Sequence, residues 1–176
     1  ADLRQFYTRI RKAGLHLKPS KCHLARHRVE LLGHMVDGTT RSPTSLNVAA
    51  VRDYARPTRT KHLHAFLGLA SYFRGYVDYF ANTAQPLYDL PHSGKRIASA
   101  WGAQHEHAFK KLKELLTAQP FLHLPSYGPK SGQFVVQADT SGCGIGAVLL
   151  QYGSRTRKKG DVPKPVAFRS RSLSRH

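Results

Sequence analysis

The chain has 176 residues, 40% of them hydrophobic, which is enough for one domain or two small ones with a packed core. Its 28 Lys and Arg outweigh 10 Asp and Glu, and the formal net charge of +18 predicts a polyanionic partner, foremost nucleic acid. A solubility charge is the alternative. Two cysteines without paired spacing favour an intracellular, cytoplasmic or nuclear location over secretion, and no apolar run reaches membrane-spanning length, so no membrane partner is expected.

The first 42 residues suggest a helix followed by a hairpin. Apolar residues at helical spacing, with Arg and Lys between them, predict a basic amphipathic helix that ends at Gly14; they are Leu3, Phe6, Tyr7 and Ile10. The chain opens inside this pattern without Met, so we expect it to be part of a longer protein. Residues 29–36 resemble one strand, and Asp37-Gly38 after it is a hairpin signal.

Residues 43–92 are predicted to form a compact helical module. Pro43 and Thr44 open a helix whose apolar side comprises Leu46, Ala50, Val51 and Tyr54. A longer helix follows, with a core stripe at three- and four-residue steps made of Leu63, Phe66, Leu67, Ala70, Phe73, Val77 and Phe80. A third short helix is expected over residues 81–90.

The remaining residues change in character after a linker at 93–100. Trp101 leads into a helix that buries Ala108, Phe109, Leu112, Leu115 and Leu116. Strands are expected on both sides of the glycine-rich turn in residues 134–151, and a third begins at Val166. Short connections imply antiparallel pairing. The predicted fold class is therefore α+β: a helical module, then a three-stranded antiparallel sheet with a leading helix.

Asp139 is the candidate for chemistry in the predicted sheet. Alternation places it at a strand end on the less apolar face, together with Val135 and Gln137. Hard cations such as Mg²⁺ prefer carboxylate oxygens, but the segment after Asp139 adds only Asp161. A turn residue in a non-catalytic domain is the alternative.

A zinc site near the first hairpin is the other metal reading of the sequence. Its potential ligands are Cys22, His23, His27 and His34. They lack a C-x₂-C pair, so we favour a Cys22 that packs under the hairpin instead.

Five sequence blocks, taken in order, resemble gypsy-type LTR retrotransposon reverse transcriptases. They are GLHLKPSKC (14–22), LLGH (31–34), KHLHAFLGLASYFRGYV (61–77), AQPL (84–87) and ADTSGCGIGAVLLQ (138–151). The resemblance implies the end of the palm with a primer-positioning hairpin in residues 1–42, a thumb in 43–92 and the N-terminal part of a ribonuclease (RNase) H-like domain in 101–176.

The resemblance also implies a function, that of an RNA-directed DNA polymerase with RNase H activity. Its expected partners are an RNA–DNA hybrid or template–primer duplex and the remainder of the polyprotein. The residues expected to contact nucleic acid are His34, Arg41, Arg59, Lys61, His62 and Arg74. Asp139 matches the first catalytic aspartate, a ligand of two Mg²⁺ ions.

One carboxylate cannot hold two Mg²⁺ ions against water, so the chain alone is expected to be inactive. Two other readings stay open. A retroelement-derived binding protein without catalysis fits the same residues, and so does a small basic structural protein. The predicted phosphate contacts have an alternative too, a solvated basic face that touches nothing.

Overall fold

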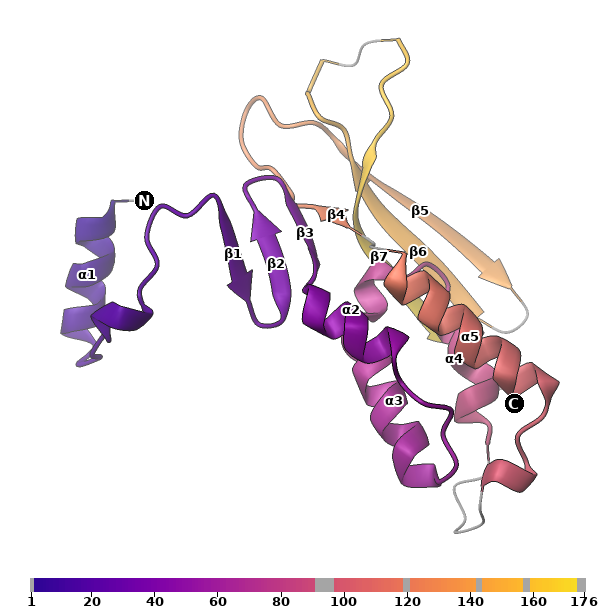
Figure 1. Ribbon diagram of the computed structural model, residues 1–176. Coiled ribbons are helices and arrows are strands. Elements are labelled where there is room, and N and C mark those ends of the chain that lie inside the picture. Colours follow the sequence, from indigo (N-terminus) through magenta and orange to yellow (C-terminus); the bar gives the residue numbers. More distant parts are fainter. Residues whose placement is uncertain (1, 91–96, 119–120, 142–143, 157–158, 174–176) are drawn as a thin grey trace.

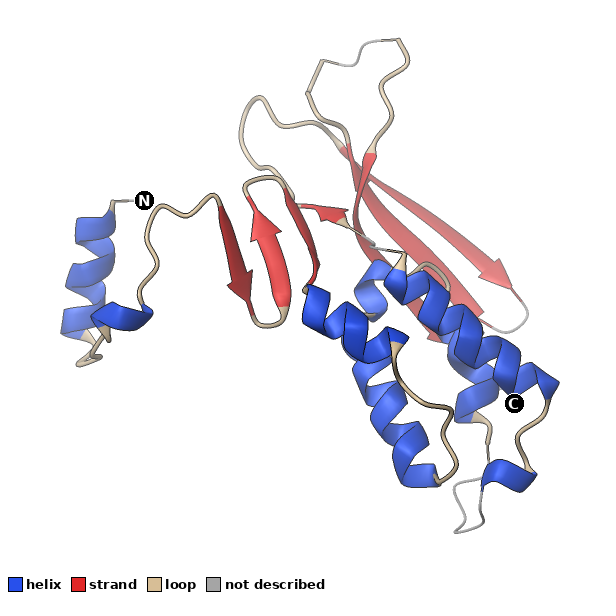
Figure 2. Cartoon of the chain, in the orientation of Figure 1, coloured by secondary structure: helices blue, strands red, loops and turns tan. Residues whose placement is uncertain are grey.

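A computed structural model describes residues 2–90, 97–118, 121–141, 144–156 and 159–173. Helices and two antiparallel sheets make up these ranges (Figures 1 and 2). The helices are α1 (Leu3–Lys12), α2 (Ser45–Arg52), α3 (Thr60–Tyr72), α4 (Phe80–Tyr88) and α5 (Ala103–Thr117). The strands are β1 (Arg28–Leu31), β2 (His34–Asp37), β3 (Thr40–Pro43), β4 (Leu122–His123), β5 (Phe134–Ser141), β6 (Gly144–Gln151) and β7 (Lys164–Ser172). The predicted α+β class and the three-stranded antiparallel sheet, β5-β6-β7, are confirmed.

The predicted single strand over residues 29–36 is wrong, because the chain turns in its middle. Leu32 and Gly33 have φ values of 49° and 72°, and β1 pairs with β2 across them. A leucine in the left-handed region is uncommon, so the apolar run hid the turn. The hairpin predicted at Asp37 is confirmed: the Asp37 carboxylate accepts backbone N–H bonds from Thr39 (3.1 Å) and Thr40 (2.8 Å).

The long helix predicted to continue through Phe80 is also shorter than expected. Helix α3 ends at Tyr72, a short 3-10 helix follows at Arg74–Tyr76, and α4 begins only after Tyr79. Tyr79, the residue directly before α4, has a left-handed backbone with φ of 49°, so α4 does not continue the direction of the preceding residues. Every residue of the predicted apolar stripe is nevertheless buried. The periodicity identified the core, and a turn inside the stripe went undetected.

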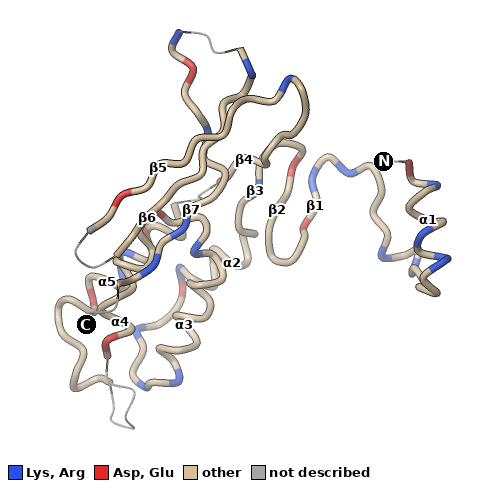
Figure 3. Tube along the Cα trace, turned by 180° about the vertical axis from the view of Figure 1, so that it is seen from behind, with Lys and Arg blue, Asp and Glu red and all other residues tan. Residues whose placement is uncertain are grey.

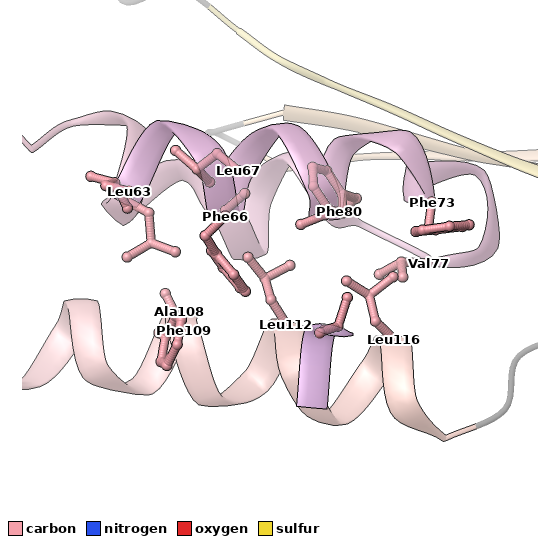
Figure 4. Packing of buried hydrophobic residues seen from close by; sticks show 14 of the residues in the cluster. Leu63, Phe66, Leu67, Phe73, Val77, Phe80, Ala108, Phe109, Leu112 and Leu116 are labelled. Atoms are coloured by element: carbon pink, nitrogen blue, oxygen red, sulfur yellow. The ribbon is translucent and has the colours of Figure 1, made fainter. Parts of the chain in front are cut away.

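One hydrophobic core joins the helical module to the helix that precedes the large sheet (Figure 4). The rings of Phe66 in α3 and Phe109 in α5 lie 4.6 Å apart between centroids. Helix α5 packs against α2 and α4, and the core continues to Leu122 in β4. The boundary predicted at 93–100 stays a prediction, and residues 93–96 lie outside the described residues. The residues before and after this boundary pack in the same hydrophobic core.

Two smaller expectations about packing are wrong. Leu46 and Ala50, placed on the apolar side of their helix, are exposed, Leu46 by 76%, because α2 turns Val51 toward α5 and the core. Cys22 is exposed and does not pack under the hairpin; its thiol donates to the Lys18 carbonyl oxygen at 3.3 Å.

The N-terminal helix stands apart from the other helices (Figure 1). Helix α1 has no buried residue, although its predicted amphipathic pattern is present. Leu3, Phe6 and Tyr7 are 50%, 48% and 41% exposed. Its apolar face is therefore uncovered. No helix in the described part of the chain has both the length and the apolar character needed to cross a membrane.

Polar contacts connect the large sheet to the hairpin and to the beginning of α4. The Arg41 guanidinium donates to the carbonyl oxygen of Val166 in β7 at 3.3 Å. The Ala81 N–H, in the first turn of α4, donates to Ser170 Oγ at 2.9 Å. The Tyr79 hydroxyl donates to Asp139 Oδ2, also at 2.9 Å. The beginning of α4 thus lies against the inner face of the sheet.

Candidate nucleic-acid interface and the Asp139 site

Basic side chains mark both ends of α3. Arg59, Lys61 and His62 are exposed around its first turn, and Arg74 is exposed just beyond its last. A helix of 13 residues is about 20 Å long at ~1.5 Å per residue. The structure therefore keeps three of the predicted contacts together and places the fourth at the far end of the same helix.

The basic side chains around α3 lack the ion pairs that basic side chains of α2 and α5 form with nearby carboxylates. Among the described residues, ion pairs join Arg52 to Asp53, Arg56 and Lys110 to Glu106, and Lys111 to Glu114. None of these pairs involves Arg59, Lys61 or Arg74. Basic positions outnumber acidic ones along the trace in Figure 3. Helix α3 therefore presents positive charge that no ion pair in the described part of the chain offsets.

The exposed stripe of α3 contains a position that sequence reasoning missed. Lys61, Ala65, Gly68 and Tyr72 follow one another at helical steps and are all exposed. A Cβ added at Gly68 would meet nothing within 4 Å, so no internal contact requires glycine there. Glycine inside a helix costs roughly 0.5–1 kcal/mol relative to alanine. Glycine at this position therefore leaves the backbone of the exposed stripe uncovered by any side chain of its own.

His34 and Arg41 lie in the hairpin and are half-buried, unlike the α3 residues. The His34 ring stacks on Tyr72 with centroids 5.4 Å apart, and its Nδ1 lies 2.8 Å from the Tyr76 hydroxyl. The Arg41 guanidinium lies 5.8 Å from the centroid of the Tyr76 ring. These contacts fasten the hairpin to the end of α3. A phosphate contact for either residue stays a prediction.

Burial lowers the pKa of His34 below its ordinary value near 6.5, and the positive charge of Arg41 adds a smaller effect in the same direction. Burial and the charge of Lys164 likewise lower the pKa of His123, against a smaller opposing effect of Asp37. The unfolded state therefore takes up protons first on acidification. Well above pH ~6.5 both imidazoles are neutral in the folded and in the unfolded protein. The free energy of unfolding therefore decreases as the pH falls from there through the lowered pKa values of the folded state.

We accordingly expect the thermal unfolding midpoint to fall between about pH 7 and pH 5, and His34→Gln to reduce this fall. Scanning calorimetry at both pH values measures the difference. His107→Gln, the same substitution at an exposed position of α5, is the matched control. An equal pH dependence in the wild type and His34→Gln would show that the imidazole is not held neutral by its surroundings.

The Asp139 carboxylate lies on the sheet face that meets the helices. Asp139 in β5 pairs with Gly146 in β6, which pairs with Ser170 in β7, so the three residues form one row across the sheet. Alternation places Asp139 on one face with Val135 and Gln137, as predicted, but the predicted strand end at Asp139 is wrong, because β5 continues to Ser141. The other face, expected to be the more apolar one, is the outer face, and Val136 on it is 67% exposed.

Both oxygens of Asp139 accept hydrogen bonds. Oδ2 takes the Tyr79 hydroxyl at 2.9 Å, and Oδ1 takes the Thr140 N–H at 2.8 Å. The hydrogen bond to Asp139 is the largest of the effects that raise the pKa of Tyr79. Loss of the hydroxyl proton would place a second negative charge beside the carboxylate. Tyr79 escaped sequence analysis, since a residue sixty positions away gives no local signal of the contact.

A cavity of about 220 Å³ opens beside this carboxylate. Asp78, Tyr79, Gln137 and Asp139 contribute polar groups to its lining. Carboxylate and amide oxygens suit a hard cation such as Mg²⁺, so the donor chemistry fits a hydrated ion. No group of three or more His, Cys, Asp or Glu side chains in the described residues is placed to hold a metal, which also leaves the zinc reading without support there.

The chain is similar in sequence to known proteins over most of its length. Residues 101–176 match the model of the RNase H-like domain found in reverse transcriptase. The chain is 32% identical over 170 residues to the retrovirus-related Pol polyprotein from transposon 297 of Drosophila melanogaster, covering 97% of the chain and 15% of that protein. It is 30% identical over 173 residues to that of the transposon gypsy from the same organism, covering 92% and 15%.

Solved structures show the same fold. The foamy viral protease-reverse transcriptase in complex with RNA/DNA hybrid matches 98% of this chain, and 22% of its own, with a TM-score of 0.68 and 24% identity. The form in complex with dsDNA gives 0.70 over 98% of this chain and 34% of its own, also at 24%. The chain spans a small part of each relative. The chain belongs to the retrotransposon and retroviral Pol polyproteins, and its residues 101–176 match the RNase H-like domain found in reverse transcriptase.

Proposed function

We propose that this chain supplies a duplex-binding surface of a reverse transcriptase, with α3 lying along a template–primer duplex or RNA–DNA hybrid. The observation that carries the proposal is the positive charge at both ends of α3, which no ion pair in the described residues offsets. The similar foamy viral protease-reverse transcriptases are in complex with dsDNA or an RNA/DNA hybrid. The matched part of each has the fold of this chain.

The chemistry of a polymerase favours such a surface. A copying enzyme must accept every sequence, and contacts to phosphates fix position without reading bases. Lys and Arg supply these contacts by releasing counterions from the duplex. Gly68 leaves the α3 backbone open between Lys61 and Tyr72, where a strand can come close. The exposed apolar side chains of α1 suit cover by the remainder of a polyprotein.

Asp139 is proposed as the first metal ligand of the RNase H-like domain. In two-metal hydrolysis, Mg²⁺ ions held by several carboxylates activate water and stabilise the leaving oxygen. The Asp139 carboxylate lies at the edge of the 220 Å³ cavity and supplies one such ligand. RNA-directed DNA polymerase and RNase H activities belong to the whole polyprotein in this proposal, and the chain alone is expected to be inactive.

Binding of a labelled RNA–DNA hybrid to charge variants tests the proposal. Lys61→Ala combined with Arg74→Ala removes one exposed cation from each end of α3, and we expect roughly a tenfold or larger loss of affinity. Fluorescence anisotropy at low salt measures it. The matched control is Lys110→Ala with Lys111→Ala, which removes two exposed cations of α5 that pair with Glu106 and Glu114. Equal losses in both pairs would sink the assignment of α3.

A further inference from the structure

We propose that Tyr79 is the positioning residue for Asp139: its hydroxyl, carried by the helical module, fixes the carboxylate of the sheet in the orientation that a cation requires. The inference rests on the proposed role of Asp139 as a metal ligand. It goes further by assigning part of the RNase H-like site to a residue of the preceding module.

The Tyr79 backbone is held in place on both sides. Its own N–H donates to Asp78 Oδ1 at 2.9 Å. Its carbonyl oxygen accepts the Thr83 N–H at 3.1 Å and the Thr83 hydroxyl at 3.2 Å. With φ of 49°, the residue caps α4 in a conformation that a tyrosine adopts only when its surroundings determine it. These hydrogen bonds fix the position of the Tyr79 backbone from which the side chain extends.

The ring of Tyr79 lies over Gly146, which has no side chain on the face of the sheet. A Cβ added at Gly146 would come within 2.6 Å of Tyr79 Cε1, a distance that real Cβ atoms essentially never show. Gly146 stands between Asp139 and Ser170 in the cross-strand row, and Ser170 Oγ accepts the Ala81 N–H. Glycine at this place thus makes the slot that lets the tyrosine reach Asp139.

The hydrogen bond leaves the carboxylate able to bind a cation. An ionised carboxylate has about four acceptor sites, and Asp139 uses one on each oxygen for Tyr79 and Thr140. Hydrogen bonds to a ligating carboxylate hold its orientation, and their removal typically costs ~10–100-fold in metal affinity. The remaining acceptor sites lie beside the cavity that Asp78 and Gln137 also line.

Mn²⁺ titration followed by NMR tests this inference on the chain as it is. The paramagnetic ion broadens nearby amide signals, so Thr140 and Gly146 report on Asp139. We expect Tyr79→Phe, which keeps the ring over Gly146, to need roughly tenfold more Mn²⁺ for the same broadening. Tyr88→Phe is the matched control: it removes another α4 hydroxyl, which lies 2.9 Å from Ser71 Oγ. We expect wild-type broadening from it and an unchanged unfolding midpoint in Tyr79→Phe.

Asp139→Asn separates the inference from the function on which it rests. Broadening that Asp139→Asn abolishes and Tyr79→Phe weakens supports both. Broadening that Asp139→Asn abolishes while Tyr79→Phe matches the wild type overturns the role of Tyr79 alone. Broadening that survives in Asp139→Asn, or is absent from the wild type, overturns the cation role of Asp139 and with it that of Tyr79. Hybrid binding by α3 is measured independently of all three results.

Discussion

Phe66→Ala is expected to lower the free energy of unfolding by ~3–5 kcal/mol, the usual cost of deleting a buried aromatic ring. Phe66 is fully buried and contacts the rings of Tyr54 and Phe109 at centroid distances of 5.3 and 4.6 Å. Deletion of the ring would leave a cavity between α3 and α5. Because one core serves both sides of the predicted domain boundary, we expect a single unfolding transition at lower urea concentration.

Urea denaturation followed by circular dichroism and by Trp101 fluorescence measures this effect, since Trp101 belongs to the same core. Leu46→Ala is the control, because Leu46 is 76% exposed, and we expect a change of at most about 0.5 kcal/mol. Two separate transitions, with only the circular dichroism signal shifted, would contradict the continuous core.

Gly132→Ala is expected to destabilise the large sheet by ~1–3 kcal/mol. A Cβ at position 132 would overlap the carbonyl oxygen of Tyr152, which is backbone and cannot move aside cheaply. The Gln151 side chain already ties this region together by donating to the carbonyl oxygens of Ser126 (2.8 Å) and Gly132 (3.0 Å). The substitution therefore strains the base of the β5–β6 pair, the strands that carry Asp139 and Gly146.

Gly153→Ala is the matched control, because a Cβ there would meet nothing within 4 Å. Thermal unfolding of both variants compares one added methyl group at two nearby sites. A similar midpoint for Gly132→Ala and Gly153→Ala would show that the close approach at position 132 relaxes without cost.

Sequence periodicity predicted the core better than it predicted the elements. The apolar stripe from Leu63 to Phe80 is buried throughout, because three- and four-residue spacing follows from burial on one side of a helix. The same spacing continues past the end of α3 at Tyr72 and across Tyr79, so the pattern alone could not show where α3 ends. Leu32 hid another turn in the same way. Both residues have left-handed backbones that local propensity does not foresee.

The candidate site was predicted in part. Asp139 stood out because a lone carboxylate near a strand end is chemically conspicuous, and alternation put it on one face with Val135 and Gln137; its metal role stays a prediction. Its partner Tyr79 could not be found from the sequence, since their contact depends on how α4 meets the sheet. Among the basic residues, sequence could not separate the balanced charges of α5 from those of α3. That distinction required the positions of Glu106 and Glu114.

The salt dependence of hybrid binding tests the central claim most directly. Contact of Arg59, Lys61 and Arg74 with phosphates predicts a slope of log affinity against log salt of about −2.7, which is a ~40-fold loss between roughly 50 and 200 mM salt. Lys61→Ala with Arg74→Ala is expected to make the slope shallower by about 2. A shallow wild-type slope, or the same slope in this variant, would contradict duplex binding by α3.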